Sequence, residues 1–367
     1  MASNVVQQIN YIAPAAPARR QPATGNEPFL RPEIGFTPNW FRTALGIDFG
    51  EKWHTDPAYR RETVVAMRAE LRKRFPGTTI GDIHKPDKPL DLLTGIYGGN
   101  PVAMIYGLGI LYAEDNWPNY EHKALTDEEA DSLEAPDLDT NPVWQDIMKQ
   151  CDWIIESEGQ LLGYVNWQGI LNNAQRLRGE KIFFDMMDSP DRCKHLFDCI
   201  YTTMSDCIKR LHARQKASGV EVSFVTVSNC LVNMISPQQY RDFFLPYDIK
   251  FAKEFGSIAV HNCAWNADPY IEDYAKIDNL GYVDMGIKSD MSRARDLVPN
   301  ARRALMYTPM DLANNEWDQI EQDVEKIANE FGPCDLVVAD IEADTPDEKI
   351  IQLIELCREI SNRKENQ

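Results

Sequence analysis

Apolar residues recur every three or four positions in several long segments of the chain, which is the spacing of helices with one buried face. The clearest segment begins at Ser189-Pro190 and ends before Gly219. A polar residue followed by proline is typical of a helix N-terminus. On this basis further helices are predicted from Thr55-Asp56-Pro57 to Phe75, from Asn141-Pro142 to about Ser157, and from Thr345-Pro346-Asp347-Glu348 onward, the last with the spacing of a capping box.

Short continuous apolar runs lie between the helical segments, and such runs are typical of parallel strands buried on both faces. The runs are Leu161 to Val165, Val222 to Val227, Ile258 to Val260, Leu280 to Val283, Ala304 to Tyr307 and Leu336 to Ala339. Repeated alternation of strand and helix over roughly 300 residues favours a single α/β domain, a (β/α)8 TIM barrel, over a doubly wound sheet. No run is followed by the Gly-x-Gly-x-x-Gly turn of a nucleotide-binding fold.

The N-terminal segment differs in composition from the rest of the chain. Residues 1–28 contain Ala-Pro-Ala-Ala-Pro-Ala and then Arg19 and Arg20, a composition that buries little surface. We therefore predict a flexible, extended N-terminal arm over residues 1–28 and one barrel domain over residues 29–367. The acidic stretch from Glu114 to Pro142 is expected to be a long surface excursion within that domain.

The charge balance narrows the range of partners. The 367 residues include 38 Lys+Arg and 57 Asp+Glu, for a net charge of −19, and this field would repel nucleic acid and anionic membrane. The longest apolar stretch, Pro101 to Ala113, is too short to cross a bilayer, and the N-terminus lacks the pattern of a secretory signal. We expect a cytoplasmic protein whose ligands are small molecules or other proteins.

The residues that follow each predicted strand carry the candidate chemistry, because a TIM barrel builds its active site at the carboxyl ends of its strands. His261 and Cys263 are two positions apart at such an end, so their side chains leave the chain on the same side and can bind one ion. The alternative interpretation is a polar strand end with a packed thiol. The spacing makes this pair a candidate zinc site whose other ligands come from other strands.

Aromatic and amide side chains at the same ends are candidate substrate-binding residues. Rings at these positions can wall a flat apolar substrate, and amides can donate hydrogen bonds to it, although both are equally suited to packing and to loop structure. The candidates are Tyr164, Asn166, Trp167, Asn229, Trp265 and Tyr307.

Two segments carry a resemblance to a known family. The stretch from Ile235 to Tyr247 followed by Phe255 to Cys263 resembles the Ser-Pro-x-x-Tyr, Leu-Pro-Tyr and His-x-Cys block of the uroporphyrinogen decarboxylase superfamily. Further matches lie at Asp188-Ser189-Pro190, Met306 to Leu312 and Asp344-Thr345-Pro346. The resemblance implies a TIM barrel of the uroporphyrinogen decarboxylase type that often forms a homodimer.

That superfamily implies two chemistries. One branch decarboxylates a porphyrinogen without a cofactor. The other comprises zinc enzymes that pass methyl groups to or from a corrinoid (cobalamin), including methylcobalamin:coenzyme M methyltransferases and O-demethylases. The arginine-rich motif of the decarboxylases would fall near Phe29 to Phe41, where Arg31 and the nearby Arg42 are poor substitutes, whereas His261-x-Cys263 matches the zinc pair of the methyltransferases.

The third zinc ligand departs from the family pattern. The methyltransferase branch has a cysteine at the position that Ala339 occupies here. Asp340, Glu342 and Cys230 are the alternatives that project to the correct end of the barrel, and we rank the two carboxylates above Cys230.

The resemblance therefore implies a zinc-dependent methyltransferase that moves a methyl group between a small donor and the corrinoid of a separate partner protein. An aryl methyl ether suits the aromatic residues best, which would make the reaction an O-demethylation. Two alternatives stay open: a metal-free decarboxylase of the same fold, and a non-catalytic corrinoid- or tetrapyrrole-binding protein.

Overall fold

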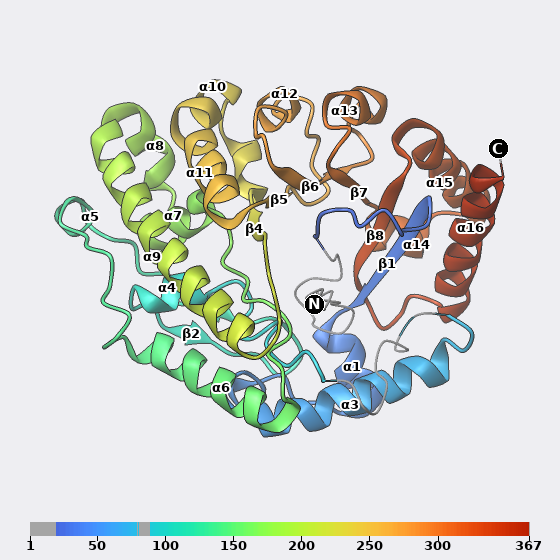
Figure 1. Ribbon diagram of the computed structural model, residues 1–367, viewed down its shortest axis with the longest axis horizontal. Helices are drawn as coiled ribbons and strands as arrows, with labels where there is room; N and C mark the ends of the chain where they lie inside the picture. The colour runs from blue at the N-terminus through green and yellow to red at the C-terminus, as the bar shows by residue number, and fades with distance from the viewer. Residues whose placement is uncertain (1–19, 79, 81–88, 367) are drawn as a thin grey trace.

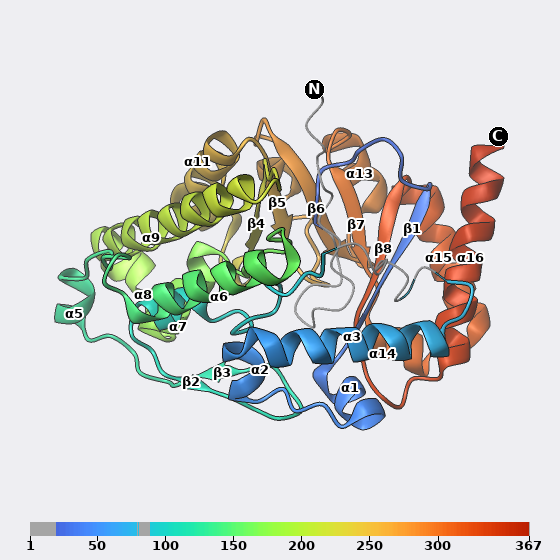
Figure 2. The same ribbon diagram turned by 60° about the horizontal axis from the view of Figure 1, so that its bottom comes forward.

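The computed structural model describes residues 20–78, 80 and 89–366. Six parallel strands form one sheet in the order β1-β8-β7-β6-β5-β4, and a ring of helices encloses the strands (Figure 1). In both views α15 and α16 lie outside β1 and β8 (Figure 2). The strands are β1 Leu30–Phe36, β4 Val225–Ser228, β5 Ile258–His261, β6 Leu280–Gly286, β7 Arg302–Met306 and β8 Cys334–Ile341. This arrangement confirms the predicted α/β barrel.

The helices and the minor elements connect these strands. A two-stranded antiparallel hairpin, β2 (Ile110–Leu111) with β3 (Asn119–Tyr120), belongs to the long connection before α5. The helices are α1 Pro38–Leu45, α2 Glu51–Thr55, α3 Pro57–Arg74, α4 Pro101–Ile105, α5 Asp127–Asp131, α6 Pro142–Glu158, α7 Ile170–Arg178, α8 Lys181–Asp188, α9 Pro190–Ala217, α10 Pro237–Gln239, α11 Leu245–Phe255, α12 Ile271–Tyr274, α13 Met291–Leu297, α14 Pro309–Asn314, α15 Trp317–Phe331 and α16 Asp347–Glu365.

The predicted helix starts agree with α3, α6, α9 and α16 to within one or two residues. Asp56 and Asn141 act as N-caps, because their side chains accept hydrogen bonds from backbone N–H groups in the first turns of α3 and α6. The capping box predicted at Thr345 is wrong. Helix α16 begins at Asp347, one residue too late for Thr345 to be its N-cap, and Asp347 instead pairs with Arg74 on α3.

Five of the six predicted strands form, but Leu161 to Val165 does not. Its neighbour in space, the turn around Asp91, is folded by hydrogen bonds from the N–H groups of Leu93 and Thr94 to the Asp91 carboxylate. The amide of Gln215 on α9 donates to the carbonyls of Leu161 and Gly163. Side chains therefore satisfy the backbone groups that a strand ladder would have used.

The register of the strands fixes what faces the barrel interior. Ala259, Tyr282, Ala304 and Val337 form a small cluster that is separate from the large apolar core. Because strand side chains alternate, the residues two positions further along point to the same interior. These residues include His261 after Ala259 and Asp284 after Tyr282, so the interior becomes polar toward the carboxyl ends.

The predicted N-terminal arm is described only in part. Residues 1–19 lie outside the described residues, and residues 20–28 have irregular backbone, with Arg20 buried. The domain boundary at residue 28 stays a prediction. No helix in the described part of the chain combines the length and the apolar character needed to cross a membrane.

Candidate metal centre

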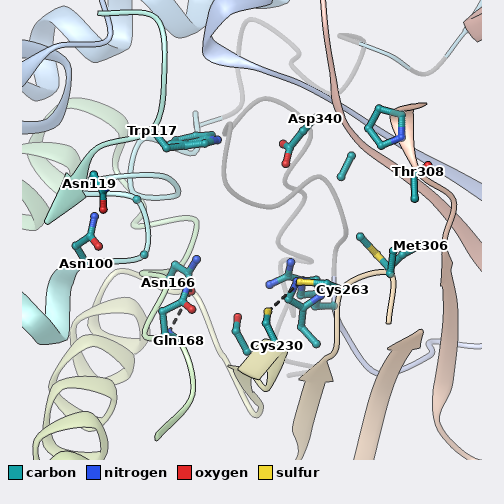
Figure 3. Close-up of a pocket in the computed structure, with 18 of the residues that line it drawn as sticks. Asn100, Trp117, Asn119, Asn166, Gln168, Cys230, Cys263, Met306, Thr308 and Asp340 are labelled. Carbon is teal, nitrogen blue, oxygen red and sulfur yellow. Dashed lines mark hydrogen bonds between the residues drawn. The ribbon is translucent and has the colours of Figure 1, made fainter. Parts of the chain in front are cut away.

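A cavity of about 470 Å³ opens at the carboxyl ends of the strands. Asn100, Asn119, Asn166 and Gln168 lie along one side, and Met306 and Thr308 lie along the other (Figure 3). The sulfurs of Cys230 and Cys263 lie together, with Trp117 and Asp340 across the cavity from them (Figure 3). The cavity therefore has the position that the barrel fold predicts for an active site.

Two sulfur atoms and one imidazole nitrogen meet in this cavity. Cys230 Sγ lies 2.9 Å from Cys263 Sγ, which lies 3.0 Å from His261 Nε2. All three atoms lie within 4.8 Å of one another. Two sulfurs and one imidazole are a donor set that zinc accepts, and a catalytic zinc has three protein ligands and one open position. The residues present therefore fit a zinc ion.

Strand register explains why these residues meet. Ser228 of β4 pairs with His261 of β5, and the Asn229 N–H donates to the His261 carbonyl at 2.7 Å. The two chains thus leave the sheet side by side, which places Cys230 next to Cys263. Cys263 has a φ of 60°, a left-handed conformation that turns the chain immediately after β5.

The carboxylate of Asp284 orients the imidazole. Asp284 Oδ2 lies 2.6 Å from His261 Nδ1, and Asp284 Oδ1 accepts the N–H of Asn262 at 2.6 Å. Asp284 is fully buried on β6. A carboxylate on one ring nitrogen fixes the tautomer and leaves the other nitrogen to face a metal. Here the nitrogen left free is Nε2, on the side of the two sulfurs.

A second buried carboxylate lies behind Cys230. Asp248 accepts hydrogen bonds from the amide of Asn229 at 2.9 Å and from the hydroxyl of Tyr240 at 2.7 Å. Tyr240 begins a π-helical turn, Tyr240–Phe244, immediately before α11. Pro246 in the first turn of α11 has no N–H to continue the regular helical ladder backward, which favours this wider turn. The Ser-Pro-x-x-Tyr and Leu-Pro-Tyr motifs therefore build the support for the Cys230 loop.

The three ligand groups hold unusual charges. A hydrogen bond from Cys263 lowers the pKa of Cys230 to about 4 against the effect of burial, and the charge of His261 lowers it further. Burial and Arg20 act to lower the pKa of His261, but Asp284 and Cys230 outweigh them and raise it to about 9. The pKa of Cys263 is raised by its hydrogen bond to Cys230 and by burial. A thiolate beside an imidazolium is the charge pattern from which a divalent metal would displace protons.

The structure favours Cys230 over Asp340 and Glu342 as the third zinc ligand, the reverse of the order expected from the sequence. Cys230 is the residue that joins His261 and Cys263, whereas neither carboxylate belongs to the cluster. Asp340 lines the cavity on another side, where burial by the surrounding chain raises the pKa of its carboxyl to about 6. Glu342 instead accepts a hydrogen bond from the hydroxyl of Thr37.

The predicted substrate-binding residues divide into two groups. Asn166 and Tyr307 line the cavity, whereas the other four are not among its lining residues. Trp167 faces outward and packs on Trp144, because side chains alternate along this segment and Asn166 faces inward. The amide of Asn229 donates a hydrogen bond to Asp248, the hydroxyl of Tyr164 is buried, and Trp265 is 52 % exposed.

Several lining residues were absent from the sequence prediction. Trp117 and Asn119 come from the acidic excursion, Arg176 from α7 and Arg20 from the predicted arm. A tryptophan within an otherwise acidic and polar stretch was the one available signal. Neither arginine follows a predicted strand, so its position in the sequence does not indicate a place in the cavity.

Backbone strain gathers around the cavity. Five described residues other than glycine have positive φ, and four of them line it: Arg20, Gln168, Cys263 and Asp340. Such conformations each cost on the order of 1–3 kcal/mol and gather at functional sites, where the surrounding structure enforces them. This distribution favours the cavity as the candidate functional centre, and three of the four residues lie outside the sulfur cluster.

The comparisons with known proteins agree with the fold and with the sequence motifs. The chain is similar to a methyltransferase from Methanosarcina mazei, with 15% sequence identity, a TM-score of 0.64, and coverage of 91% of this chain and 94% of that chain. No curated protein matches the chain. The family model described as uroporphyrinogen decarboxylase (URO-D) matches residues 100–360, a span that holds the whole sulfur and imidazole cluster. With more than half of its length matched, the chain belongs to the uroporphyrinogen decarboxylase family.

Proposed function

We propose that this protein is a zinc-dependent methyltransferase that moves a methyl group between a small donor and the corrinoid of a partner protein. The observation that carries the proposal is the cluster of Cys230, His261 and Cys263 at the mouth of the barrel. A structural likeness to a methyltransferase is in keeping with it.

The residues of this chain have separable roles in the proposed reaction. Cys230, His261 and Cys263 would hold the zinc, and Asp284 would hold the imidazole in the tautomer that presents Nε2. Bound zinc would supply Lewis acidity, either to a departing oxygen or to an acceptor thiol. Trp117 and the amides of the cavity wall would orient the small molecule against the cluster.

Spectroscopic methyl transfer tests the proposal. The purified chain is supplied with zinc, and conversion of cob(I)alamin to methylcobalamin is followed by its visible spectrum, with a panel of aryl methyl ethers as donors. We expect turnover in the wild type and its loss in Cys230→Ser, His261→Ala and Cys263→Ser. Cys199→Ser is the matched control, because Cys199 is a thiol on α9 outside the cavity.

Two outcomes would contradict the proposal. Porphyrinogen turnover by a zinc-free preparation would establish the metal-free decarboxylase. Tight corrinoid binding with neither zinc nor methyl transfer would favour the non-catalytic corrinoid binder.

A further inference from the structure

Two thiols in the cavity lie in contact with each other. Cys230 Sγ and Cys263 Sγ are 2.9 Å apart, and both side chains are half-buried at the cavity (Figure 3). Within the described chain no other two cysteines lie within hydrogen-bond distance of each other. The other six cysteines are buried: Cys151, Cys193, Cys199, Cys207, Cys334 and Cys357. The described chain therefore presents one accessible pair of thiols to a small oxidant.

The backbone spacing of the two cysteines suits a disulfide. Each cysteine stands two residues beyond a paired position, because Ser228 of β4 pairs with His261 of β5 in parallel register. Neighbouring strands lie about 4.8 Å apart, and the Cα atoms of a disulfide are typically about 4.4–6.8 Å apart. To form the bond, the sulfurs must close by about 0.9 Å, to an S–S distance of about 2.05 Å. Small side-chain rotations cover this distance, so the register of the strands can stay unchanged.

The candidate metal centre depends on the same two sulfurs. Zinc is bound by thiolates, and a sulfur that has entered a disulfide has no thiolate charge to offer a metal. Oxidation of the pair would leave His261 as the one remaining ligand of the three in the cluster. A protein zinc site takes three or four protein ligands, so one imidazole does not hold the ion. The disulfide and the bound metal therefore exclude each other.

We propose that Cys230 and Cys263 form a reversible disulfide that excludes the metal, with hydrogen peroxide as the oxidant. One thiol attacks the peroxide, the O–O bond breaks, and the sulfur becomes a sulfenic acid as one water is released. The second sulfur then attacks the sulfenic sulfur, and a second water leaves as the S–S bond forms. Two thiols thus lose two electrons and two protons, and one hydrogen peroxide becomes two waters. A dithiol reverses the oxidation by exchange.

This inference deepens the proposed function, because its regulatory consequence rests on zinc being bound by the same sulfurs. It makes the candidate metal centre a switch that is able to bind zinc under reducing conditions and unable to bind it after exposure to peroxide. The hydrogen bond between Asp284 and His261 takes no part in the bond change, so a dithiol can restore the site without refolding.

Thiol counting on the whole chain tests the inference. Reduced, chelator-treated protein is exposed to hydrogen peroxide, denatured and titrated with a chromogenic disulfide reagent. We expect the number of free thiols to fall by two from the eight of the reduced chain, and dithiothreitol to restore all eight. Peptide mass spectrometry without reduction should assign the loss to a disulfide between Cys230 and Cys263. Zinc-loaded protein should react more slowly and release one zinc per disulfide formed, which a chromophoric chelator records.

Variants separate the thiol pair from the metal. His261→Ala keeps both thiols and lacks one metal ligand, so it should form the disulfide as readily with added zinc as without it. Cys230→Ser and Cys263→Ser should form no intramolecular disulfide. Cys199→Ser is the matched control, because it removes a buried thiol and should form the same disulfide as the wild type. Thermal melting of the reduced proteins establishes that each variant is folded.

The inference is overturned if peroxide leaves all eight thiols free, if the disulfide joins other cysteines, or if the oxidised chain keeps its zinc. Oxidation of the two sulfurs to sulfinic acids in place of a disulfide would also overturn it. Reduced protein that forms the disulfide but binds no zinc would refute the metal site and leave the thiol pair standing. Zinc binding without a disulfide after peroxide would do the reverse.

Discussion

Replacing Asp284 with asparagine tests how the imidazole is held. The carboxylate is fully buried and accepts two hydrogen bonds of 2.6 Å, from His261 Nδ1 and from the N–H of Asn262. Asparagine has nearly the same shape but only one acceptor oxygen, so its NH₂ group must face one of these two donors. The change removes one charge-assisted hydrogen bond and leaves the backbone of the site in place.

The expected loss of zinc affinity follows from the strength of the hydrogen bond that is removed. A buried hydrogen bond to a charged group contributes about 1.5–3 kcal/mol. Since about 1.4 kcal/mol corresponds to a factor of ten in affinity, zinc binding should weaken by roughly 10- to 100-fold. The same range is typical when the outer partner of a metal-bound histidine is removed.

Competition with a chromophoric chelator measures the zinc affinity of Asp284→Asn. The control is Asp335→Asn, because Asp335 is equally buried but pairs with Arg31 and Arg302 at the opposite end of the sheet. Asp335→Asn should melt at a lower temperature and keep the zinc affinity of the wild type. Equal zinc affinities in wild type and Asp284→Asn would show that the Asp284 carboxylate does not orient His261 for the metal.

Three further predictions concern the surroundings of the cluster. Gly286→Ala would place a Cβ 2.0 Å from the carbonyl oxygen of Ala264, so the loop that carries Cys263 should shift. The zinc affinity should then fall, and an unchanged affinity in chelator competition would contradict this. Asp340→Asn should keep one zinc per chain in elemental analysis, and loss of the metal would make Asp340 a ligand. Burial raises the pKa of Asp248 from 3.8 to about 6, so the folded chain holds this proton where the unfolded chain has lost it. The free energy of unfolding therefore falls by up to about 3 kcal/mol as pH rises from about 4 to about 6. The difference in urea unfolding between Asp248→Asn and wild type should change across that window, and a difference independent of pH would contradict the assignment.

Five of the six parallel strands were predictable because each leaves a continuous apolar run. Strand β1 was not predicted, because Arg31, Pro32 and Glu33 interrupt its apolar residues. Leu161 to Val165 is the opposite case, with the apolar pattern of a strand but different backbone partners. Gln215, which occupies its carbonyls, lies far away in the chain, and no local signal reports that contact. Apolar periodicity thus reports burial and leaves the choice of hydrogen-bond partners open.

The candidate site was predictable where one strand supplies it and obscure where two strands share it. His261 and Cys263 lie on one strand end, so their spacing alone indicates a common side. Cys230 reaches them through the register of β4 against β5, and the residues of either strand taken alone do not specify that register. Arg20 is still further removed, because it enters the cavity from a segment whose composition indicates an arm.

The coordination of zinc in the loaded protein shows directly whether Cys230, His261 and Cys263 bind one metal ion. X-ray absorption at the zinc edge distinguishes sulfur from nitrogen and oxygen neighbours by distance, about 2.3 Å for sulfur and about 2.0–2.1 Å for imidazole nitrogen. The cluster predicts two sulfur neighbours and one imidazole in the wild type, and one sulfur in Cys230→Ser. A zinc surrounded by nitrogen and oxygen alone, or two sulfurs retained in Cys230→Ser, would contradict the proposed metal centre.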